Sequence, residues 1–360
     1  MTTALTFLLI LIILVLIHEF GHYFAAKKSG VLVEEFGFGF PPRLFGKKIG
    51  ETLYSINLIP LGGFVRLYGE DHNEVKNKKI ENSKIPSHRA FVNKTPFQKT
   101  IIITAGVVMN IFFGWILISI LYTQGVPSPV GVTVNAIQKN SPASEAGLKI
   151  GDKLISITHS DQTVKIITTD DLVQSTQRFA DEITMLQINR GDKIFSVQIT
   201  PRSRPPKDQG ALGIVIEQQI EIKHYPWYMA FYQGFIETLS MTKTIAAELL
   251  KIPVQLISRQ STDVEFTGPV GIAKIVNEAR KFGITALIQI TAILSINLAV
   301  INILPFPALD GGRQIFILYE WVTGKRANQN LEHYLNIVGI ILLLTLSAVI
   351  TIFDIQKYWG

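Results

Sequence analysis

Four long stretches of nearly uninterrupted apolar residues divide the chain. Each stretch is long enough to cross the roughly 30 Å hydrocarbon core of a bilayer as one helix. They predict membrane-spanning helices at about Thr3–Ala25, Thr100–Tyr122, Ile284–Pro305 and Leu331–Phe353. Between the second and third stretches, short segments with alternating apolar and polar positions predict β-strands. The pattern therefore predicts a multi-pass α-helical membrane protein with an inserted α+β domain.

Composition supports this fold class. Of the 360 residues, 48% are apolar, and the mean hydropathy is +0.30, as expected for a membrane protein that also has soluble parts. The first apolar stretch has no basic start and no Ala-x-Ala exit, so we do not expect a cleaved signal peptide. The chain has no cysteine, which excludes disulfides and thiolate ligands. Any bound metal must therefore use His, Asp or Glu.

Basic residues are concentrated in two connecting segments. Residues 26–99 hold 13 of the 34 lysines and arginines, and the loop between the third and fourth stretches adds Arg313, Lys325 and Arg326. The positive-inside rule then predicts that both segments face the cytoplasm and that both termini lie outside. The net charge of +6 is better explained by contact with anionic lipid headgroups than by nucleic-acid binding.

The first stretch ends in the pentapeptide His18-Glu19-Phe20-Gly21-His22. Two histidines four positions apart share one face of a helix, so both imidazoles can bind one Zn²⁺. Glu19 is placed to take a proton from the attacking water as a general base. The alternative to a metal site is a histidine at a helix end beside a solvated glutamate. That alternative does not explain why three polar side chains cluster where their burial near lipid is costly. His18 lies roughly 22 Å along the helix from Thr3, so the metal is expected inside the membrane near the cytoplasmic side.

The third stretch leads to a candidate third ligand. Pro305 and Pro307 end the helix, and the two glycines that follow Asp310 allow a sharp turn. By topology, Asp310 lies at the same membrane depth as His18 and His22. Its carboxylate would complete a His₂Asp site with a fourth position left for water. The alternative is an ordinary Asp-Gly turn, but the chain offers no better third ligand near membrane depth.

Two motifs together resemble a known family. HEFGH at the end of the first stretch and NILPFPALDGG after the third are similar to those of the site-2 protease family of intramembrane metalloproteases. The branch that cleaves anti-sigma factors, the regulator-of-sigma-E proteases, matches best. PLGGFVRLYGE at 60–70 and FVNKTPFQKT at 91–100 also agree, and the resemblance extends over nearly the whole chain. One departure is Val107, which follows Gly106 where the family usually has proline.

The resemblance implies a bacterial cytoplasmic-membrane protease with one Zn²⁺ per chain. His18, His22 and Asp310 would be the ligands and Glu19 the base, while Asn302 would hold the substrate or the oxyanion. For Asn302 an interhelical hydrogen bond is an equal alternative. The substrates would be single-span membrane proteins already cut outside the membrane, such as anti-sigma factors or remnant signal peptides.

A β-hairpin is predicted at about 52–68. Thr52–Arg66 alternates apolar and polar residues and then reaches Pro60 and Gly62-Gly63, which predict the turn. The family has a re-entrant β-loop at this place, so we expect the hairpin to enter the bilayer. An edge strand at Gly63, Phe64 and Val65 could then hold an unwound substrate by strand addition. The alternative is a hairpin on the membrane surface.

The inserted domain resembles a PDZ domain over Gly131–Ile157, and its bounds are predicted at about 125–202. Asp170–Ala180 is expected to be the groove helix. The domain would lie outside the cytoplasm and could bind a peptide or protein in its groove. It could select substrates by size or act as a spacer. Residues 203–283 are predicted to form a linker and amphipathic helices on the membrane surface.

Two other functions remain possible from the sequence. A catalytically silent PDZ scaffold could keep a vestigial zinc site, although such a protein would not need Glu19. A metal transporter would need several acids along a path through the membrane, whereas Asp310 stands essentially alone there. The sequence therefore favours the protease.

Overall fold

A computed structural model describes residues 3–70, 85–191, 193–207, 209–258 and 267–359. The chain forms two compact units. The first, which we call the helical unit, combines Met1–Tyr122 with Pro226–Gly360, and the second, the sheet unit, is Thr123–Tyr225. The inserted domain predicted from the alternating pattern therefore exists as a separate body.

Among the described residues, four helices are long and apolar enough to cross a membrane. They are α1 (Thr3–Lys28), α3 (Pro96–Gln124), α8 (Ile284–Ile303) and α10 (Gln329–Trp359). All four coincide with the predicted stretches. Helix α8 ends two residues before Pro305 because the residue that precedes a proline avoids the helical conformation, and Leu304 is extended.

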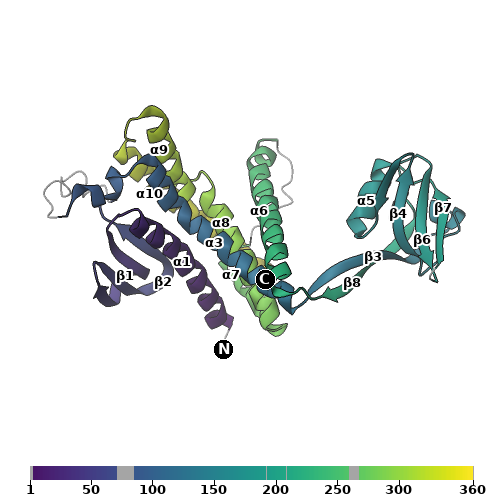
Figure 1. Cartoon of the computed structure of the whole chain (residues 1–360), viewed down its shortest axis with the longest axis horizontal. Helices are drawn as coiled ribbons and strands as arrows, with labels where there is room; N and C mark the ends of the chain where they lie inside the picture. The colour runs from purple at the N-terminus through teal and green to yellow at the C-terminus, as the bar shows by residue number, and fades with distance from the viewer. Residues whose placement is uncertain (1–2, 71–84, 192, 208, 259–266, 360) are drawn as a thin grey trace. The chain divides into compact units, whose positions relative to one another are not determined.

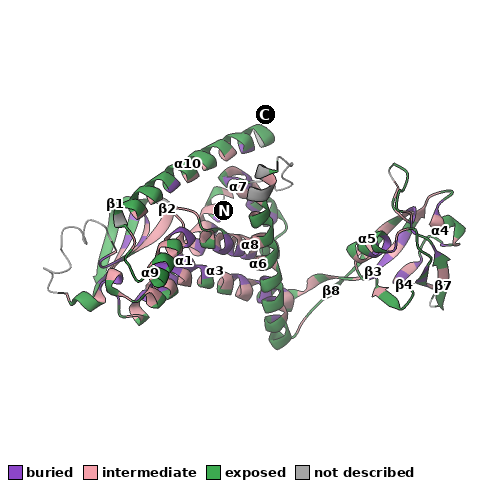
Figure 2. Cartoon of the chain, turned by 90° about the horizontal axis from the view of Figure 1, so that it is seen from above, coloured by how far each residue is buried: buried purple, intermediate pink, exposed green. Residues whose placement is uncertain are grey.

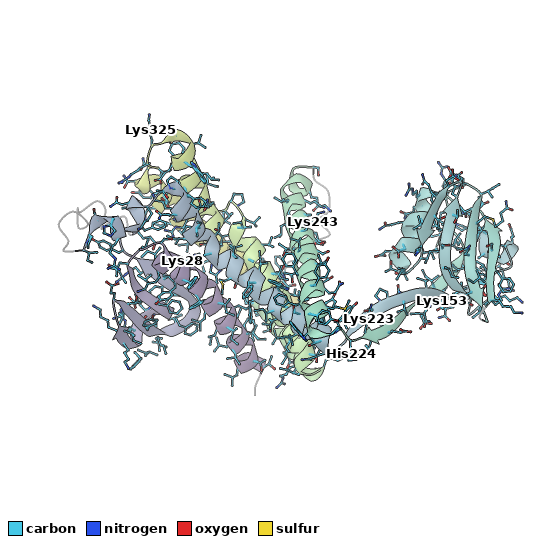
Figure 3. All side chains as sticks on the ribbon, viewed as in Figure 1. Lys28, Lys153, Lys223, His224, Lys243 and Lys325 are labelled. Carbon is cyan, nitrogen blue, oxygen red and sulfur yellow. The ribbon has the colours of Figure 1, made fainter. Side chains whose placement is uncertain are left out.

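The described residues of the helical unit form three further α-helices: α6 (Trp227–Ile257), α7 (Pro269–Lys281) and α9 (Asp310–Thr323). Helix α6 packs against α3 and α8. The Trp115 indole donates a hydrogen bond to the Phe231 carbonyl at 2.8 Å, and Met241 packs against a buried cluster that includes Ile296. Lys243 lies midway along α6 (Figure 3). Helices thus form in the predicted segment, and their position at the membrane surface stays a prediction.

A two-stranded antiparallel sheet lies beside α1 (Figure 1). Strand β1 covers Val33–Ile49 and β2 covers Thr52–Leu67, and the chain reverses at Gly50–Glu51. The reversal predicted at Pro60 and Gly62-Gly63, within a hairpin at about 52–68, is present inside β2: residues 53–56 and 63–66 pair with 35–38 in opposite directions. The direct pairing of the two arms that a hairpin implies is wrong, because residues 35–38 of β1 lie between them. The pairing register shifts at this point, next to Phe40. Pro60 and Gly62-Gly63 therefore mark the place where β2 crosses from one side of β1 to the other and reverses its direction.

The register makes β1 central to this sheet. Phe36 is level with Val65 on one side and with Tyr54 on the other. Residues 63–67 therefore form an outer edge that pairs with β1 on one side. The pairing of the described strands leaves the other side of this edge free.

The sheet unit is a six-stranded sheet in the order β7-β6-β4-β3-β8, with β5 paired to β4. Its strands are β3 (Val126–Ile137), β4 (Lys153–His159), β5 (Gln162–Lys165), β6 (Thr184–Arg190), β7 (Lys193–Ile199) and β8 (Ile214–Lys223). Helices α4 (Pro142–Glu145) and α5 (Thr169–Arg178) complete it. Leu154, Ile157 and Leu186 are among the fully buried residues of its core.

The predicted end of this domain at residue 202 is too early. Strand β8 pairs with β3 from Val126↔Lys223 to Ile137↔Ile214, so the sheet continues to residue 223. The sequence IVIEQQIEIK of β8 alternates as a strand should, but it follows a proline-rich segment that had suggested the domain boundary. The assignment of this unit to the PDZ domains stays a prediction.

Candidate metal centre

Three side chains from two distant parts of the helical unit meet at one point. The Nε2 atoms of His18 and His22 lie 3.1 Å apart. The Asp310 Oδ2 lies 3.1 Å from the first of these atoms and 3.3 Å from the second. Both histidines are buried, and Asp310 is half-buried. The three side chains predicted as ligands are therefore brought together.

These three separations fit a zinc coordination shell. Tetrahedral Zn²⁺ with bonds of about 2.0–2.1 Å to nitrogen and oxygen separates its ligand atoms by about 3.3 Å. In addition, Asp310 Oδ2 is buried and no hydrogen-bond donor reaches it in the described residues. A buried carboxylate oxygen without a donor is costly unless a cation neutralises it. Donor chemistry, spacing and burial thus all suit Zn²⁺, and three protein ligands leave a fourth position for a reactant.

Close packing of α1 on α3 positions the histidines. Gly106 faces the His18 and His22 rings so closely that a side chain there would collide with both imidazoles. Gly21 meets the Ala105 carbonyl in the same way. The absence of a side chain at these positions lets the two helices approach and places the imidazoles against the α3 backbone. Gly106 was noted in the sequence only as the residue that precedes Val107. Its role in the contact between α1 and α3 was not predicted.

Each imidazole has a partner for its second nitrogen. His22 Nδ1 lies 2.9 Å from the Ile102 carbonyl, which can only accept a hydrogen bond. Nδ1 therefore carries the proton, and Nε2 keeps the lone pair that a metal requires. His18 Nδ1 lies 3.3 Å from the Asn110 amide. The Asn110 carbonyl oxygen is buried without a donor, and exchanging its amide oxygen and nitrogen would let that oxygen accept from His18 Nδ1.

Asn110 is a residue of the site that the sequence analysis did not identify. It is fully buried in α3, and Ser295 of α8 donates a hydrogen bond to its backbone carbonyl at 2.8 Å. Its position four residues after Gly106 places it on the same face of α3. An amide inside an apolar helix one turn from such a glycine was the signal that could have revealed it.

A short irregular segment carries Asp310 into the site. Ala308 has a left-handed backbone with φ of 72°, which is unusual for a residue other than glycine. The Asn336 side chain of α10 accepts a hydrogen bond from the Ala308 N–H at 3.2 Å. Gly339, one turn further along α10, lies against the Pro307 backbone. Helix α10 therefore holds the segment, and α9 begins directly at Asp310.

Two opposing effects set the ionisation of Asp310. Burial favours the neutral carboxyl and raises its pKa, but the imidazoles of His18 and His22, when protonated, outweigh burial through hydrogen bonds and positive charge. The pKa of Asp310 therefore lies well below its ordinary value. The group is ionised at neutral pH, as a metal ligand must be.

A cavity of about 260 Å³ opens beside the three side chains. Its lining includes His18, Glu19, His22 and Asp310, together with residues 63–65 of the outer β2 edge. Glu19 lies next to Gly63, where an added Cβ would come within 3.0 Å of its side chain. The predicted base and the predicted strand residues thus border the same space as the candidate metal ligands.

Asn302 differs from the other predicted site residues. It is half-buried on the last turn of α8, and the residues that line the cavity do not include it. Its predicted contact with the substrate or oxyanion therefore stays a prediction.

Comparison with known proteins agrees with this site. A sequence model of peptidase family M50 matches residues 6–346. The zinc metalloprotease RasP of Geobacillus kaustophilus is 30% identical over 430 aligned residues, which cover 99% of this chain and 98% of the relative. The regulator of sigma-W protease RasP of Bacillus subtilis is 29% identical over 426 residues, with 99% and 98% covered.

The apolar helices and the cluster of two histidines and an aspartate define a membrane zinc peptidase. The chain belongs to peptidase family M50, the site-2 zinc metalloproteases. It is thus an integral membrane zinc metalloendopeptidase, and Zn²⁺ is its cofactor.

Proposed function

We propose that the enzyme hydrolyses a peptide bond of single-span membrane proteins within the bilayer, after a first cut outside the membrane. His18, His22 and Asp310 hold Zn²⁺, and Glu19 is the general base. The observation that carries this proposal is the cavity in which the three convergent ligand atoms, Glu19 and a free strand edge meet.

Strand addition explains how a helical substrate becomes accessible. In a helix each backbone carbonyl accepts a hydrogen bond from the N–H four residues later, so it is not accessible to attack. Once the helix is unwound in lipid, these backbone groups need new partners. The outer edge of β2 at Gly63, Phe64 and Val65 has backbone groups available for such partners and borders the cavity. An extended substrate paired to this edge would present its scissile carbonyl to the metal centre.

The chemistry then follows from the residues around the cavity. Zn²⁺, when bound, polarises the attacking water and the scissile carbonyl. Glu19 accepts the proton of the water and delivers it to the departing amine nitrogen. His18 and His22 keep their Nε2 lone pairs for the metal because their Nδ1 atoms face Asn110 and Ile102.

The substrates we propose are anti-sigma factors and remnant signal peptides in the bacterial cytoplasmic membrane. The name of the Bacillus subtilis relative, a regulator of sigma-W protease, favours an anti-sigma factor. Basic residues between α1 and α3 and between α8 and α10, such as Lys28 and Lys325 (Figure 3), favour a metal centre near the cytoplasmic side. The sheet unit would then lie outside the cytoplasm, as a PDZ domain that binds a peptide segment in its groove.

The substitution Glu19→Gln tests this function. It removes the base while keeping the size of the side chain, so we expect cleavage to fall by about 10²–10⁴-fold with unchanged zinc content. The measurement is cleavage of a single-span substrate by the purified full-length protein in liposomes, with elemental analysis for zinc. The exposed Glu237 of α6 provides the matched control, Glu237→Gln. Full activity of Glu19→Gln would contradict the assigned role, and absence of cleavage by the wild type would favour the silent scaffold.

A further inference from the structure

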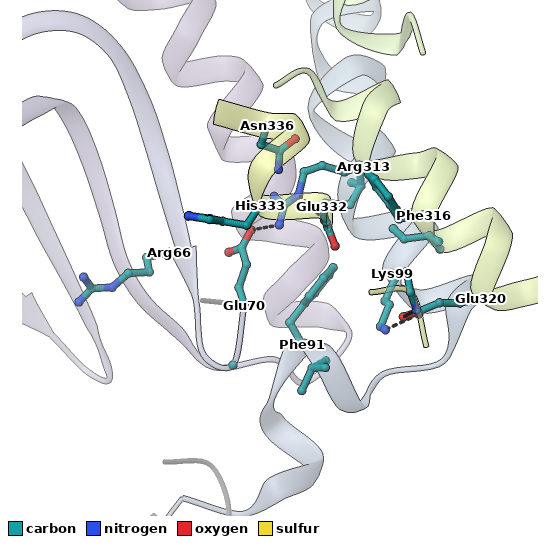
Figure 4. A pocket seen from close by; sticks show the side chains of 15 residues that line it. Arg66, Glu70, Phe91, Lys99, Arg313, Phe316, Glu320, Glu332, His333 and Asn336 are labelled. Carbon is teal, nitrogen blue, oxygen red and sulfur yellow. Dashed lines mark hydrogen bonds and ion pairs between the residues drawn. The ribbon is translucent and has the colours of Figure 1, made fainter. Parts of the chain in front are cut away.

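A second, larger cavity adjoins the metal cavity. It has a volume of about 420 Å³, within the range of roughly 300–1,000 Å³ that is typical of ligand sites. Glu70, Ile103 and Arg313 line both cavities, so the two spaces meet at these residues. Figure 4 shows the side chains around the larger space, which come from β2, α3, α9 and α10. We call it the flank cavity.

The outer β2 edge leads from one cavity to the other. Gly63 borders the metal cavity beside Glu19, and further along the chain Arg66, Gly69 and Glu70 border the flank cavity. A peptide paired to this edge advances by about 3.3 Å per residue. Its residues about three to six positions from the scissile bond would therefore reach the flank cavity.

The elements around the flank cavity identify which side of the substrate this is. Its lining comes from the segment between α1 and α3, the segment between α8 and α10, and the adjoining helix turns. These are the two basic segments of the chain, which the positive-inside rule assigns to the cytoplasm. The substrate residues that enter are therefore those of its cytoplasmic flank. The same rule enriches Lys and Arg in that flank of any single-span protein.

Among the described residues that line the flank cavity, Glu332 is the carboxylate with the weakest ion pair. Lys99 Nζ pairs with Glu320 Oε2 at 2.7 Å, and Arg313 Nη2 pairs with Glu70 Oε1 at 2.5 Å. By contrast, Glu332 Oε1 lies 4.0 Å from Arg313 Nε, at the limit for an ion pair, and shares this arginine with Glu70 (Figure 4). A half-buried carboxylate in this position would gain from a second cation.

We infer that the flank cavity binds the cytoplasmic flank of the substrate and that Glu332 pairs there with a substrate lysine or arginine. This inference rests on the proposed function, because the substrate must first be held along the β2 edge. Glu332 is then a specificity residue: it favours substrates with a positive charge near the cleavage site, and it takes no part in the chemistry.

A charge reversal tests this inference. Two test substrates share one apolar span and carry either three lysines or three glutamates at about the third to sixth positions on the cytoplasmic side of the cleaved bond. For the full-length enzyme with Glu332→Arg, we expect the ratio of kcat/KM for the lysine substrate to that for the glutamate substrate to fall at least tenfold. The control Glu237→Arg makes the same charge change on the exposed face of α6 and should leave the ratio unchanged. An unchanged ratio in Glu332→Arg would overturn the inference.

Cross-linking gives a second test that does not need an active Glu332 variant. The chain has no cysteine, so one introduced cysteine reacts without background. In the full-length Glu19→Gln protein, we expect His333→Cys to form a disulfide with a substrate cysteine three to six positions into the cytoplasmic flank. A cysteine at Glu237 should not react with it. If no flank position cross-links to residue 333, the flank cavity does not bind this part of the substrate.

The two proposals fail in different ways. If wild type and Glu19→Gln both leave the substrates intact, the proposed protease function on these substrates fails. If wild type cleaves them and Glu332→Arg keeps the same charge preference, only the role of the flank cavity fails.

Discussion

The two units of the molecule differ in where their large apolar side chains and their metal-binding groups lie. The sheet unit follows the pattern of a protein in water, with Leu154, Ile157 and Leu186 fully buried. The helical unit buries His18, His22 and Asn110. Helix α10 is largely exposed (Figure 2), and many of its exposed residues are large and apolar. A helix whose apolar side chains face outward suits a hydrocarbon solvent, and polar groups then lie between helices where they find partners. The comparison shows one chain folded for two solvents.

Two carboxylates make the contrast specific. In the sheet unit, buried Asp152 accepts hydrogen bonds from the Lys149 N–H at 2.8 Å and from both arms of the Arg190 guanidinium at 2.6 Å. In the helical unit, Asp310 Oδ2 is buried and faces two imidazoles without a hydrogen-bond donor in the described residues. The first carboxylate is satisfied by protein alone and is structural. The second requires a cation, so its surroundings are those of a ligand.

Removal of the Asp310 carboxylate should have the largest effect. With Asp310→Ala only two protein ligands remain, so we expect zinc to be lost from the purified protein and cleavage to be abolished. The sheet unit has its own core and should keep its thermal transition. Elemental analysis and calorimetry measure the two outcomes. A variant that retains a full equivalent of zinc would show that Asp310 is not a ligand.

The glycine contact between α1 and α3 should come next. In Gly106→Ala the new methyl group meets both imidazoles, so we expect zinc affinity to fall by about 100-fold, as for residues that orient metal ligands. Gly210→Ala in the sheet unit adds the same group into open space and serves as the control. Competition with a zinc chelator gives the affinities. Equal affinities in the two variants would mean that α1 and α3 are not held as closely as described.

In the sheet unit, Asp152→Asn should cost about 2 kcal/mol of unfolding free energy, because charge-assisted hydrogen bonds to Arg190 become neutral ones. The Asp152 carboxyl loses hydration on burial, which raises its pKa, but Arg190 and the Lys149 N–H lower that pKa below its ordinary value of 3.8. A lowered folded-state pKa stabilises the fold above the unfolded pKa, and this stabilisation is lost as pH falls below about 4.

Urea unfolding of residues 123–225 at pH 7 and pH 3 measures both effects. The difference between wild type and Asp152→Asn should shrink at pH 3. Asp161→Asn, at an exposed position, should match the wild type at both pH values. A constant difference across this range would mean that the buried ion pair does not titrate with folding.

The smallest expected effect concerns the segment before Asp310. Asn336→Leu removes the acceptor for the Ala308 N–H, so we expect zinc affinity to fall about tenfold, the lower end for residues that orient ligands. Asn336→Asp keeps an acceptor oxygen and should restore the affinity. Asn330→Leu, at an exposed position of the same helix, is the control. If Asn336→Asp and Asn336→Leu behave alike, the hydrogen bond does not position Asp310.

Much of the fold could be predicted because long apolar runs and metal motifs are local signals. Runs of this length specify spanning helices with little ambiguity, and His18-Glu19-Phe20-Gly21-His22 fixes two imidazoles on one helical face. Asp310 was found by combining topology with helix-breaking prolines. In each case the decisive residues are neighbours in sequence, or one topological rule connects them.

The remaining features depend on contacts between distant segments. Pro60 and Gly62 indicated the change of direction, but sequence alone does not show that the two arms flank β1 instead of pairing with each other. Strand β8 was missed because its partner β3 lies far away in sequence. Asn110 and Asn336 gain their roles only where α3 meets His18 and where α10 meets Ala308.

The metal cluster draws its members from segments far apart in the sequence, with His18 and His22 in α1 and Asp310 at the start of α9. During synthesis the chain emerges from its N-terminus onward. Until Asp310 has emerged and entered the membrane, a nascent chain holds only two of the three candidate ligands. The order of the residues thus delays proteolysis until the segment with Asp310 has joined the two histidines, and membrane proteins nearby are protected from an unfinished enzyme.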